Sequence, residues 1–324
     1  TRGTMAGSRS VVLAALVANG VIAILKFFAF LASGSPSMLS EAYHSVSDTG
    51  NQVFLLIGIS YSGRTATQTH PFGYGKAQFF YSFLVSVLLF GIAGWESLTH
   101  GYDALTSGGH GGGTQEVVIA SVNITALVPL STFQLSVGVL SAAIVFESWA
   151  FLKANTELQR QIDEYGWSGV REAFRETSDV TTLTAFTEDA VALGGAAIAL
   201  VGVVASRYTG NEVYDAVTAV LIGALLMGFA VALAWENKRL LLGESLGPAA
   251  EDRLRAAVAD AAGVDAVDGL RSMFVGPQTV LVTVDVSFDD DLDTTAIEDR
   301  IDEIAAALQA ADDRVSIVYV EPER

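Results

Sequence analysis

Long apolar segments recur over the first two-thirds of the chain, separated by short polar connections. Six segments approach or exceed the length of about 20 residues that an α-helix needs to cross a bilayer. They run from Val11 to Ala32, Ser37 to Ser62, Phe79 to His100, Thr132 to Asn155, Thr182 to Ser206 and Val213 to Trp235. The pattern therefore predicts a multi-pass α-helical membrane protein with six transmembrane helices. A further apolar piece, Val117–Val128, precedes the fourth helix and is ambiguous.

The last part of the chain has a different pattern. Helical spacing of apolar residues predicts two helices, and alternation of apolar and polar residues predicts strands. The expected elements are a helix at 249–262, strands at 267–275 and 279–288, a helix at 295–308 and a strand at 315–320. Gly276-Pro277 marks the turn between the first two strands, and Asp293 is placed to cap the second helix. The order αββαβ predicts a small α+β, ferredoxin-like domain.

These patterns divide the chain into three parts. Residues 1–9 are expected to form an N-terminal tail, in which residues 1–4 before Met5 resemble a cloning remnant. Residues 10–240 are expected to form the six-helix transmembrane domain, and residues 241–324 the αββαβ domain.

Composition and charge refine this picture. The chain is 51% hydrophobic, yet its formal net charge is −18. From Glu244 onward there are 19 acidic and 6 basic residues and no lysine, so the charge belongs to a water-exposed tail. An acidic, arginine-over-lysine surface indicates a salt-adapted, halophilic source, with an ordinary acidic domain as the alternative. The acidity argues against nucleic acid as a partner, and the absence of cysteine excludes disulfides and thiolate metal sites.

Basic residues lie on alternate sides of the predicted helices. They precede the first helix and lie in the loops after the second, fourth and sixth. These residues are Arg9, Arg64, Lys76, Lys153, Arg160, Arg171, Arg175, Lys238 and Arg239, whereas the loop after the fifth helix has only Arg207 and those after the first and third have none. By the positive-inside rule, this distribution predicts that both termini are cytoplasmic in a protein of the cell membrane.

Two ionisable residues lie one turn apart inside the second apolar segment. His44 and Asp48 are four positions apart, so their side chains share one face of the helix. An ionisable side chain in a membrane helix costs about 3 kcal/mol or more, so such residues need a reason to be there. Imidazole and carboxylate at this spacing supply half of a tetrahedral divalent-metal site.

The fifth apolar segment carries two more acids, Glu188 and Asp189. Acids in two different membrane helices at similar depth favour a site between helices. A satisfied polar contact would explain His44 alone, but it does not explain His44, Asp48 and Asp189 together, since each burial has its own cost.

Three stretches of this chain stand out as motifs: SEAYHSVSDTGNQ at residues 40–52, HPFGYGK at residues 70–76, and Glu188-Asp189 followed by Gly194. In these stretches the chain resembles the cation diffusion facilitator family of divalent-metal/proton antiporters. The first and third are most similar to the zinc transporter branch that includes the nuclear-receptor-coactivator-like member. The resemblance covers nearly the whole chain and implies a transporter rather than an enzyme, with no cofactor beyond the transported ion.

The resemblance implies a tetrahedral site between the second and fifth helices, with two ligands on each. His44, Asp48 and Asp189 match three of these positions, but Ala185 stands at the fourth and has no ligand atom. Glu188 is our expected substitute because it lies three residues from position 185. Water, Asn51 and Gln52 are the other options, and Glu188 could instead orient another ligand.

Other histidines of the chain are poorer ligands. In the family, the loop between the second and third helices often binds metal through two histidines, but here His70 matches the first and Tyr74 replaces the second. We therefore expect His70 to be structural or a weak, transient ligand. His110 lies alone in a glycine-rich loop, and the tail has no histidine, so Asp289–Asp291 is expected to be a solvated turn. The resemblance alone implies a homodimer.

Two further charged residues remain open. Lys26 in the first helix either pairs with an intramembrane acid or extends its ammonium toward the interface, and Glu147 in the fourth is its partner or lines the pathway.

The expected function is efflux of a divalent metal, foremost Zn2+, in exchange for protons by alternating access. Protons and metal compete for the same imidazole and carboxylates, which is the physical basis of antiport. Replacement of one histidine by a carboxylate hardens the site, so Mn2+, Fe2+ or Co2+ is the alternative cargo. A non-transporting metal-binding membrane protein is another alternative. An intramembrane aspartyl protease using Asp48 and Asp189 would leave His44 unexplained.

Overall fold

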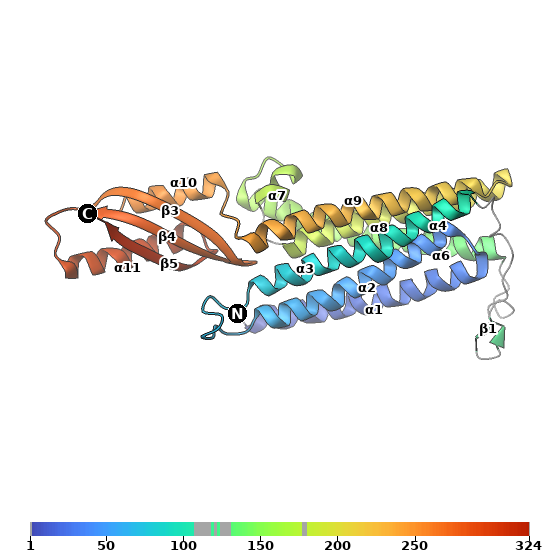
Figure 1. Ribbon diagram of the computed structural model, residues 1–324, viewed down its shortest axis with the longest axis horizontal. Helices are drawn as coiled ribbons and strands as arrows, with labels where there is room; N and C mark the ends of the chain where they lie inside the picture. Colours follow the sequence, from blue (N-terminus) through green and yellow to red (C-terminus); the bar gives the residue numbers. More distant parts are fainter. Residues whose placement is uncertain (1, 107–117, 120–121, 124–130, 177–179, 324) are drawn as a thin grey trace. The chain divides into compact units, whose positions relative to one another are not determined.

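The computed structural model describes residues 2–106, 118–119, 122–123, 131–176 and 180–323 (Figure 1). The chain forms two compact units, which we call the helical unit and the tail unit. The helical unit comprises Thr1–Ile57, Tyr81–Tyr165 and Thr181–Trp235. The tail unit comprises Gly58–Phe80, Gly166–Val180 and Glu236–Arg324.

Each apolar segment predicted to cross the membrane is helical. The helices are α1 (Arg2–Ser33), α2 (Pro36–Ser62), α3 (Lys76–Leu88) continued by η1 (Leu89–Gly94) and α4 (Trp95–Thr106), α6 (Thr132–Tyr165), α8 (Val180–Thr209) and α9 (Val213–Leu242). Helix α1 begins within the region that the sequence assigned to an N-terminal tail. The π-helical stretch η1 interrupts the third segment, where the sequence pattern predicted an unbroken α-helix.

Four helical stretches among the described residues are long and apolar enough to cross a membrane. They are Lys76–Thr106, Thr132–Tyr165, Ala185–Thr209 and Val213–Leu242. Asn19–Ser33 of α1 is a shorter apolar helical stretch. Helix α2 is not among the four, because serine, acid and amide side chains interrupt its apolar residues. The protein is thus a multi-pass membrane protein whose second helix is unusually polar.

Burial in the helical unit is the reverse of that in a water-soluble bundle. Val145 is 72% exposed and Leu152 is 62% exposed, whereas Lys26 and Glu41 are fully buried. Large apolar side chains that face outward on several helices indicate a surface in contact with lipid. Small and apolar side chains of α1, α6, α8 and α9 fill the interior between the polar groups.

The C-terminal part has the predicted αββαβ order. Its elements are α10 (Pro248–Ala259), β3 (Val264–Gly276), β4 (Thr279–Phe288), α11 (Thr294–Ala311) and β5 (Val315–Glu323). Strands β3 and β4 form an antiparallel hairpin, and β5 pairs parallel to β4, so β4 is central. The parallel pairing requires a crossover, which α11 supplies. Asp293 caps α11 as predicted, with its Oδ1 accepting from the Ala296 N–H at 2.8 Å.

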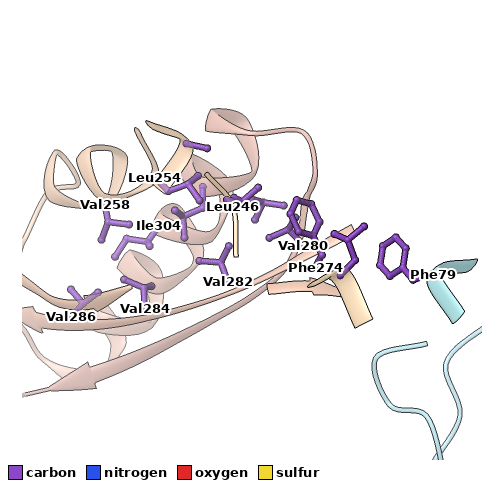
Figure 2. Packing of buried hydrophobic residues seen from close by; sticks show 14 residues of the cluster. Phe79, Leu246, Leu254, Val258, Phe274, Val280, Val282, Val284, Val286 and Ile304 are labelled. Atoms are coloured by element: carbon purple, nitrogen blue, oxygen red, sulfur yellow. The ribbon is translucent and has the colours of Figure 1, made fainter. Parts of the chain in front are cut away.

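One face of the sheet is buried under both helices. Val280, Val282, Val284 and Val286 of β4 are all fully buried, as alternate residues of a strand with one covered face should be. Figure 2 shows these valines together with Leu254, Val258 and Ile304 of the covering helices. Phe79 of α3 and Leu240 of α9 belong to the same cluster, and Phe79 lies beside Phe274 (Figure 2). The core of the tail unit therefore includes residues from the ends of two membrane helices.

Some elements were not foreseen or lie partly outside the described residues. Helix α7 (Val170–Glu176) was not predicted from the sequence. Two short strands, β1 (Val118–Ile119) and β2 (Val122–Asn123), pair within the segment that the sequence left ambiguous. The rest of that segment lies outside the described residues, as does the predicted loop around His110.

Acid is expected to loosen the tail unit through Asp312. This carboxylate accepts two hydrogen bonds from Arg314, at 2.8 Å from Nε and 2.6 Å from Nη2. Burial acts to raise the pKa of Asp312, but the hydrogen bonds and charge of Arg314 outweigh it and lower the pKa. A lowered folded-state pKa stabilises the fold above the unfolded pKa of about 3.9, and this contribution disappears as pH falls through the folded value.

Hydrogen exchange measures this contribution of Asp312 to stability. Exchange of β5 and the end of α11 should be compared between the full wild-type chain and Asp312→Asn, from pH 6 to pH 3. We expect the wild type to be better protected at pH 6 and the difference to vanish toward pH 3. An unchanged difference across this range would contradict the assignment.

Candidate metal site

The polar face of α2 carries the two residues that the sequence singled out. His44 is fully buried and Asp48 is nearly so. Their spacing brings the His44 Nδ1 to 3.4 Å from Asp48 Oδ1. Among the residues that the structure describes, neither ring nitrogen of His44 has a hydrogen-bond partner. A buried imidazole with both nitrogens unused is rare in a folded protein and leaves them available to a ligand.

Helix α8 contributes Glu188, which is tied directly to α2. The Asn51 Nδ2 donates to Glu188 Oε2 at 2.7 Å, across 137 positions in the sequence. Asn51 lies three residues beyond Asp48, so the same stretch of α2 presents the histidine, the aspartate and the amide. The hydrogen bond fixes Glu188 beside the His44–Asp48 turn.

Asp48 and Glu188 act on each other as neighbouring acids. Among charged side chains, Glu188 has the largest electrostatic influence on Asp48, so the two carboxyl groups lie near each other. Two carboxylates in a dry interior cannot both keep a negative charge at short range. The pair must therefore share a proton or hold a cation, and this alternative is what an exchange site needs.

Asp189 follows Glu188 on α8, and both residues are half-buried. It acts electrostatically on Glu188 and on Glu147 of α6, while Ala185 one turn earlier offers no ligand atom. Within the described ranges, no three histidine, aspartate or glutamate side chains are gathered closely enough to hold a metal ion. The structure thus brings Asp48 together with His44 and with Glu188, and it does not gather all four predicted ligands around one point.

A buried ion pair accompanies these residues, and the sequence did not identify its acid. Lys26 Nζ of α1 donates to Glu41 Oε2 of α2 at 2.7 Å, and both side chains are fully buried. The sequence left Lys26 either paired with an intramembrane acid or extended toward the interface, and named Glu147 as a possible partner. Glu41 is the partner, and Glu147 acts on Lys26 more weakly. Glu41 lies three residues before His44 and therefore on the same face of α2. This spacing was the signal in the sequence that could have pointed to Glu41.

The HPFGYGK stretch forms an aromatic loop end in the tail unit. The His70 ring stacks on Tyr74, with centroids 4.2 Å apart, and Tyr74 packs edge-on against Tyr61. This arrangement agrees with the expected structural role of His70. The other expected carboxylate cluster, Asp289–Asp291, is exposed, as a solvated turn should be.

Gly75 in this loop allows a close approach to the β3–β4 turn. A Cβ atom at Gly75 would lie 2.4 Å from the Val275 carbonyl oxygen and 2.7 Å from Gly276 Cα, so backbone would have to move. We expect Gly75→Ala to destabilise this contact by about 1–3 kcal/mol, the usual cost of overpacking. Hydrogen exchange at residues 273–279 in the full chain should rise. Gly138→Ala, where the added carbon meets no atom within 4 Å, is the control. Equal exchange in the two variants would contradict the expected effect.

Comparison with known proteins gives a family. Residues 12–242 match the family described as the cation efflux transmembrane domain. A curated relative, "Proton-coupled zinc antiporter SLC30A9, mitochondrial" from Homo sapiens, is 29% identical over 283 residues, which is 87% of this chain and 46% of the relative. The chain thus spans about half the length of that protein.

Two further similarities involve one magnetosome protein. "Magnetosome protein MamM" from Paramagnetospirillum magneticum is 25% identical over 319 residues, covering 98% of this chain and 88% of the relative. A solved nickel form of the MamM CTD is 22% identical, covers 24% of this chain and 96% of its own, and has a TM-score of 0.23.

Proposed function

Because this chain belongs to the cation efflux family, the cation diffusion facilitators, we propose that it exports Zn2+ in exchange for protons. Members of this family are transporters and not enzymes, as the sequence predicted, so the protease alternative is set aside. A metal efflux transporter of the membrane is the general function. The identity of the metal, the proton coupling and the location of the site are the parts proposed here.

The hydrogen bond from Asn51 to Glu188, which places this acid beside the His44–Asp48 turn, is the observation that carries the proposal. Two acids on different helices share a buried position that needs either a proton or a cation. With His44 beside Asp48, metal binding would displace protons from the same groups, and protonation would release the metal. The proposed ligands are His44, Asp48, Glu188 and Asp189, between α2 and α8. Metal binding requires these side chains to come closer together, because no three of the described histidine, aspartate and glutamate side chains are gathered closely enough to hold an ion.

The donor set favours zinc. One imidazole nitrogen and several carboxylate oxygens, without sulfur, suit Zn2+, and a carboxylate in place of a second histidine makes Mn2+, Fe2+ or Co2+ the alternative cargo. The printed name of the human relative, a proton-coupled zinc antiporter, supports zinc and protons. A membrane protein that binds metal without moving it remains the second candidate, separated from the first by whether flux occurs.

The membrane topology and assembly are also proposed. All six predicted segments span the membrane in this account, with both termini cytoplasmic and the tail a ferredoxin-like domain in the cytoplasm of a cell-membrane protein. The distribution of basic residues supports this orientation. Dimerisation rests on the family resemblance, and salt adaptation rests on the acidic tail.

Proton release on metal binding tests the shared-site idea. Zn2+ should be titrated calorimetrically into the purified protein in two buffers of different ionisation enthalpy at the same pH. A site that exchanges metal for protons gives heats that differ between the buffers, because the released protons are taken up by buffer. Saturable binding with no proton release would argue for the non-transporting alternative, and no binding would remove the proposal.

A further inference from the structure

A permanent cation lies within electrostatic reach of a proposed metal ligand. The Lys26 ammonium is fully buried, and the carboxylates that act on it are those of Glu41, Glu147 and Asp48, in that order. A buried ammonium is stable only beside a counter-charge. If Lys26 turned from Glu41 to Asp48, it would occupy the carboxylate that the metal needs. The position of Glu41 therefore decides which acid Lys26 neutralises.

Helix α8 shapes the space in which the Glu41 carboxylate lies. A Cβ atom at Gly195 would lie 2.5 Å from Glu41 Oε1, so the carboxylate would have to shift from this place if residue 195 carried a side chain. Among the described residues, Oε1 has no hydrogen-bond partner, while Oε2 accepts from Lys26. The carboxylate is thus seated by its ion pair on one side and by close packing against α8 on the other.

The neighbouring glycine shows that this close packing is local. A Cβ atom at Gly194 would meet only Leu225 Cδ2 at 3.8 Å, which is ordinary van der Waals contact. Gly194 and Gly195 are adjacent in α8, so substitution by alanine has the same effect on helix propensity at both. The two positions differ in whether Glu41 must move.

We propose that Glu41, in the space that Gly195 leaves, is a positioning residue that keeps the Lys26 ammonium away from Asp48 and so leaves Asp48 free for the transported metal. The inference rests on the proposed function, because it takes Asp48 as a metal ligand. It adds a role for Lys26, Glu41 and Gly195 as the group that sets the affinity of the site. Without Glu41, Lys26 turns to Asp48 or Glu147, the other acids that act on it.

Charge substitutions give the first test. Glu41→Gln removes the counter-charge and should raise the Kd for Zn2+ by about tenfold, the scale at which groups that orient metal ligands act. The double variant Lys26→Met with Glu41→Gln removes the competing cation as well, and should recover most of the lost affinity. If Glu41 had only a structural role, the double variant would show no recovery. It loses both members of a buried pair, so it should bind Zn2+ no better than Glu41→Gln does.

A second test moves Glu41 without changing any charge. Gly195→Ala should weaken Zn2+ binding in the same direction as Glu41→Gln, while Gly194→Ala should bind as the wild type does. Isothermal titration of the purified full chain with ZnCl2 gives both values, and size-exclusion chromatography confirms that each variant is folded. Adding Lys26→Met to Gly195→Ala should again restore affinity.

The outcomes separate this inference from the proposed function. Absence of Zn2+ binding in the wild type would overturn both. Wild-type binding with unchanged affinity in Glu41→Gln and Gly195→Ala would overturn only the positioning role. A double variant as weak as Glu41→Gln would also overturn it, because the loss would then not come from the freed Lys26.

Discussion

Substitution of Asp48 by asparagine is expected to lower the affinity for Zn2+ by at least about 100-fold. Removal of a group that only orients a ligand lowers metal affinity by about 10- to 100-fold. Removal of a direct ligand should therefore lower the affinity by an amount at or above the top of that range. Asparagine keeps the size of the side chain and removes its charge and its ability to exchange a proton. Because Asp48 lies 3.4 Å from His44 and within electrostatic reach of Glu188, its loss affects both neighbours.

Zn2+ titration of the purified variant measures this effect. Asp163→Asn is the matched control, because Asp163 is an exposed acid on α6 that takes part in none of the contacts of the site. We expect the control to bind as the wild type does. If Asp48→Asn bound Zn2+ as tightly as the control, α2 would not carry the site and the account of the buried acids would be wrong.

Glu188→Gln is expected to give the second-largest loss of Zn2+ affinity. The size of the loss shows whether Glu188 is the fourth ligand. Glutamine keeps an acceptor for the Asn51 amide, so the link between α2 and α8 survives while the charge is lost. If Glu188 binds the metal, affinity should fall by about 100-fold. If it only orients another ligand, the loss should be nearer tenfold.

The position one turn earlier offers a rescue. Adding Ala185→His to Glu188→Gln places an imidazole where the family resemblance implies a ligand, and should restore most of the affinity for Zn2+. Glu157→Gln, an exposed acid on α6, is the control for removal of a carboxylate. Unchanged binding in Glu188→Gln would mean that water or an amide of α2 completes the site.

The sequence predicted the elements whose cause is local. The length of the apolar segments located a helix at each predicted membrane segment, although several of these helices extend beyond the predicted bounds. The alternation of apolar and polar residues located β4 at its observed bounds, Thr279–Phe288. The αββαβ order and the Asp293 cap followed from turn and capping chemistry. Helix α7 was not predicted because it is short and polar and its apolar residues show no helical periodicity. The π-helical stretch in the third segment leaves no mark in a hydrophobic pattern.

The site was predicted less completely, because its parts meet only in three dimensions. His44 and Asp48 share a face by spacing alone, so their proximity was foreseeable. The hydrogen bond from Asn51 to Glu188 and the ion pair from Lys26 to Glu41 join residues of different helices. Spacing within α2 puts Glu41 on the same face as His44, but it does not show that Lys26 of α1 pairs with Glu41, because that depends on how the helices pack.

Metal-driven proton flux tests the central claim most directly. The purified protein would be placed in liposomes with a pH dye inside, and Zn2+, Mn2+, Fe2+ or Co2+ would be added outside. We expect Zn2+ to drive proton movement in the wild type and in Asp163→Asn, and to drive none above protein-free liposomes in Asp48→Asn and Asp189→Asn. Absence of flux with every metal, for inserted protein that still binds Zn2+, would contradict the account and leave a membrane protein that binds metal without transporting it.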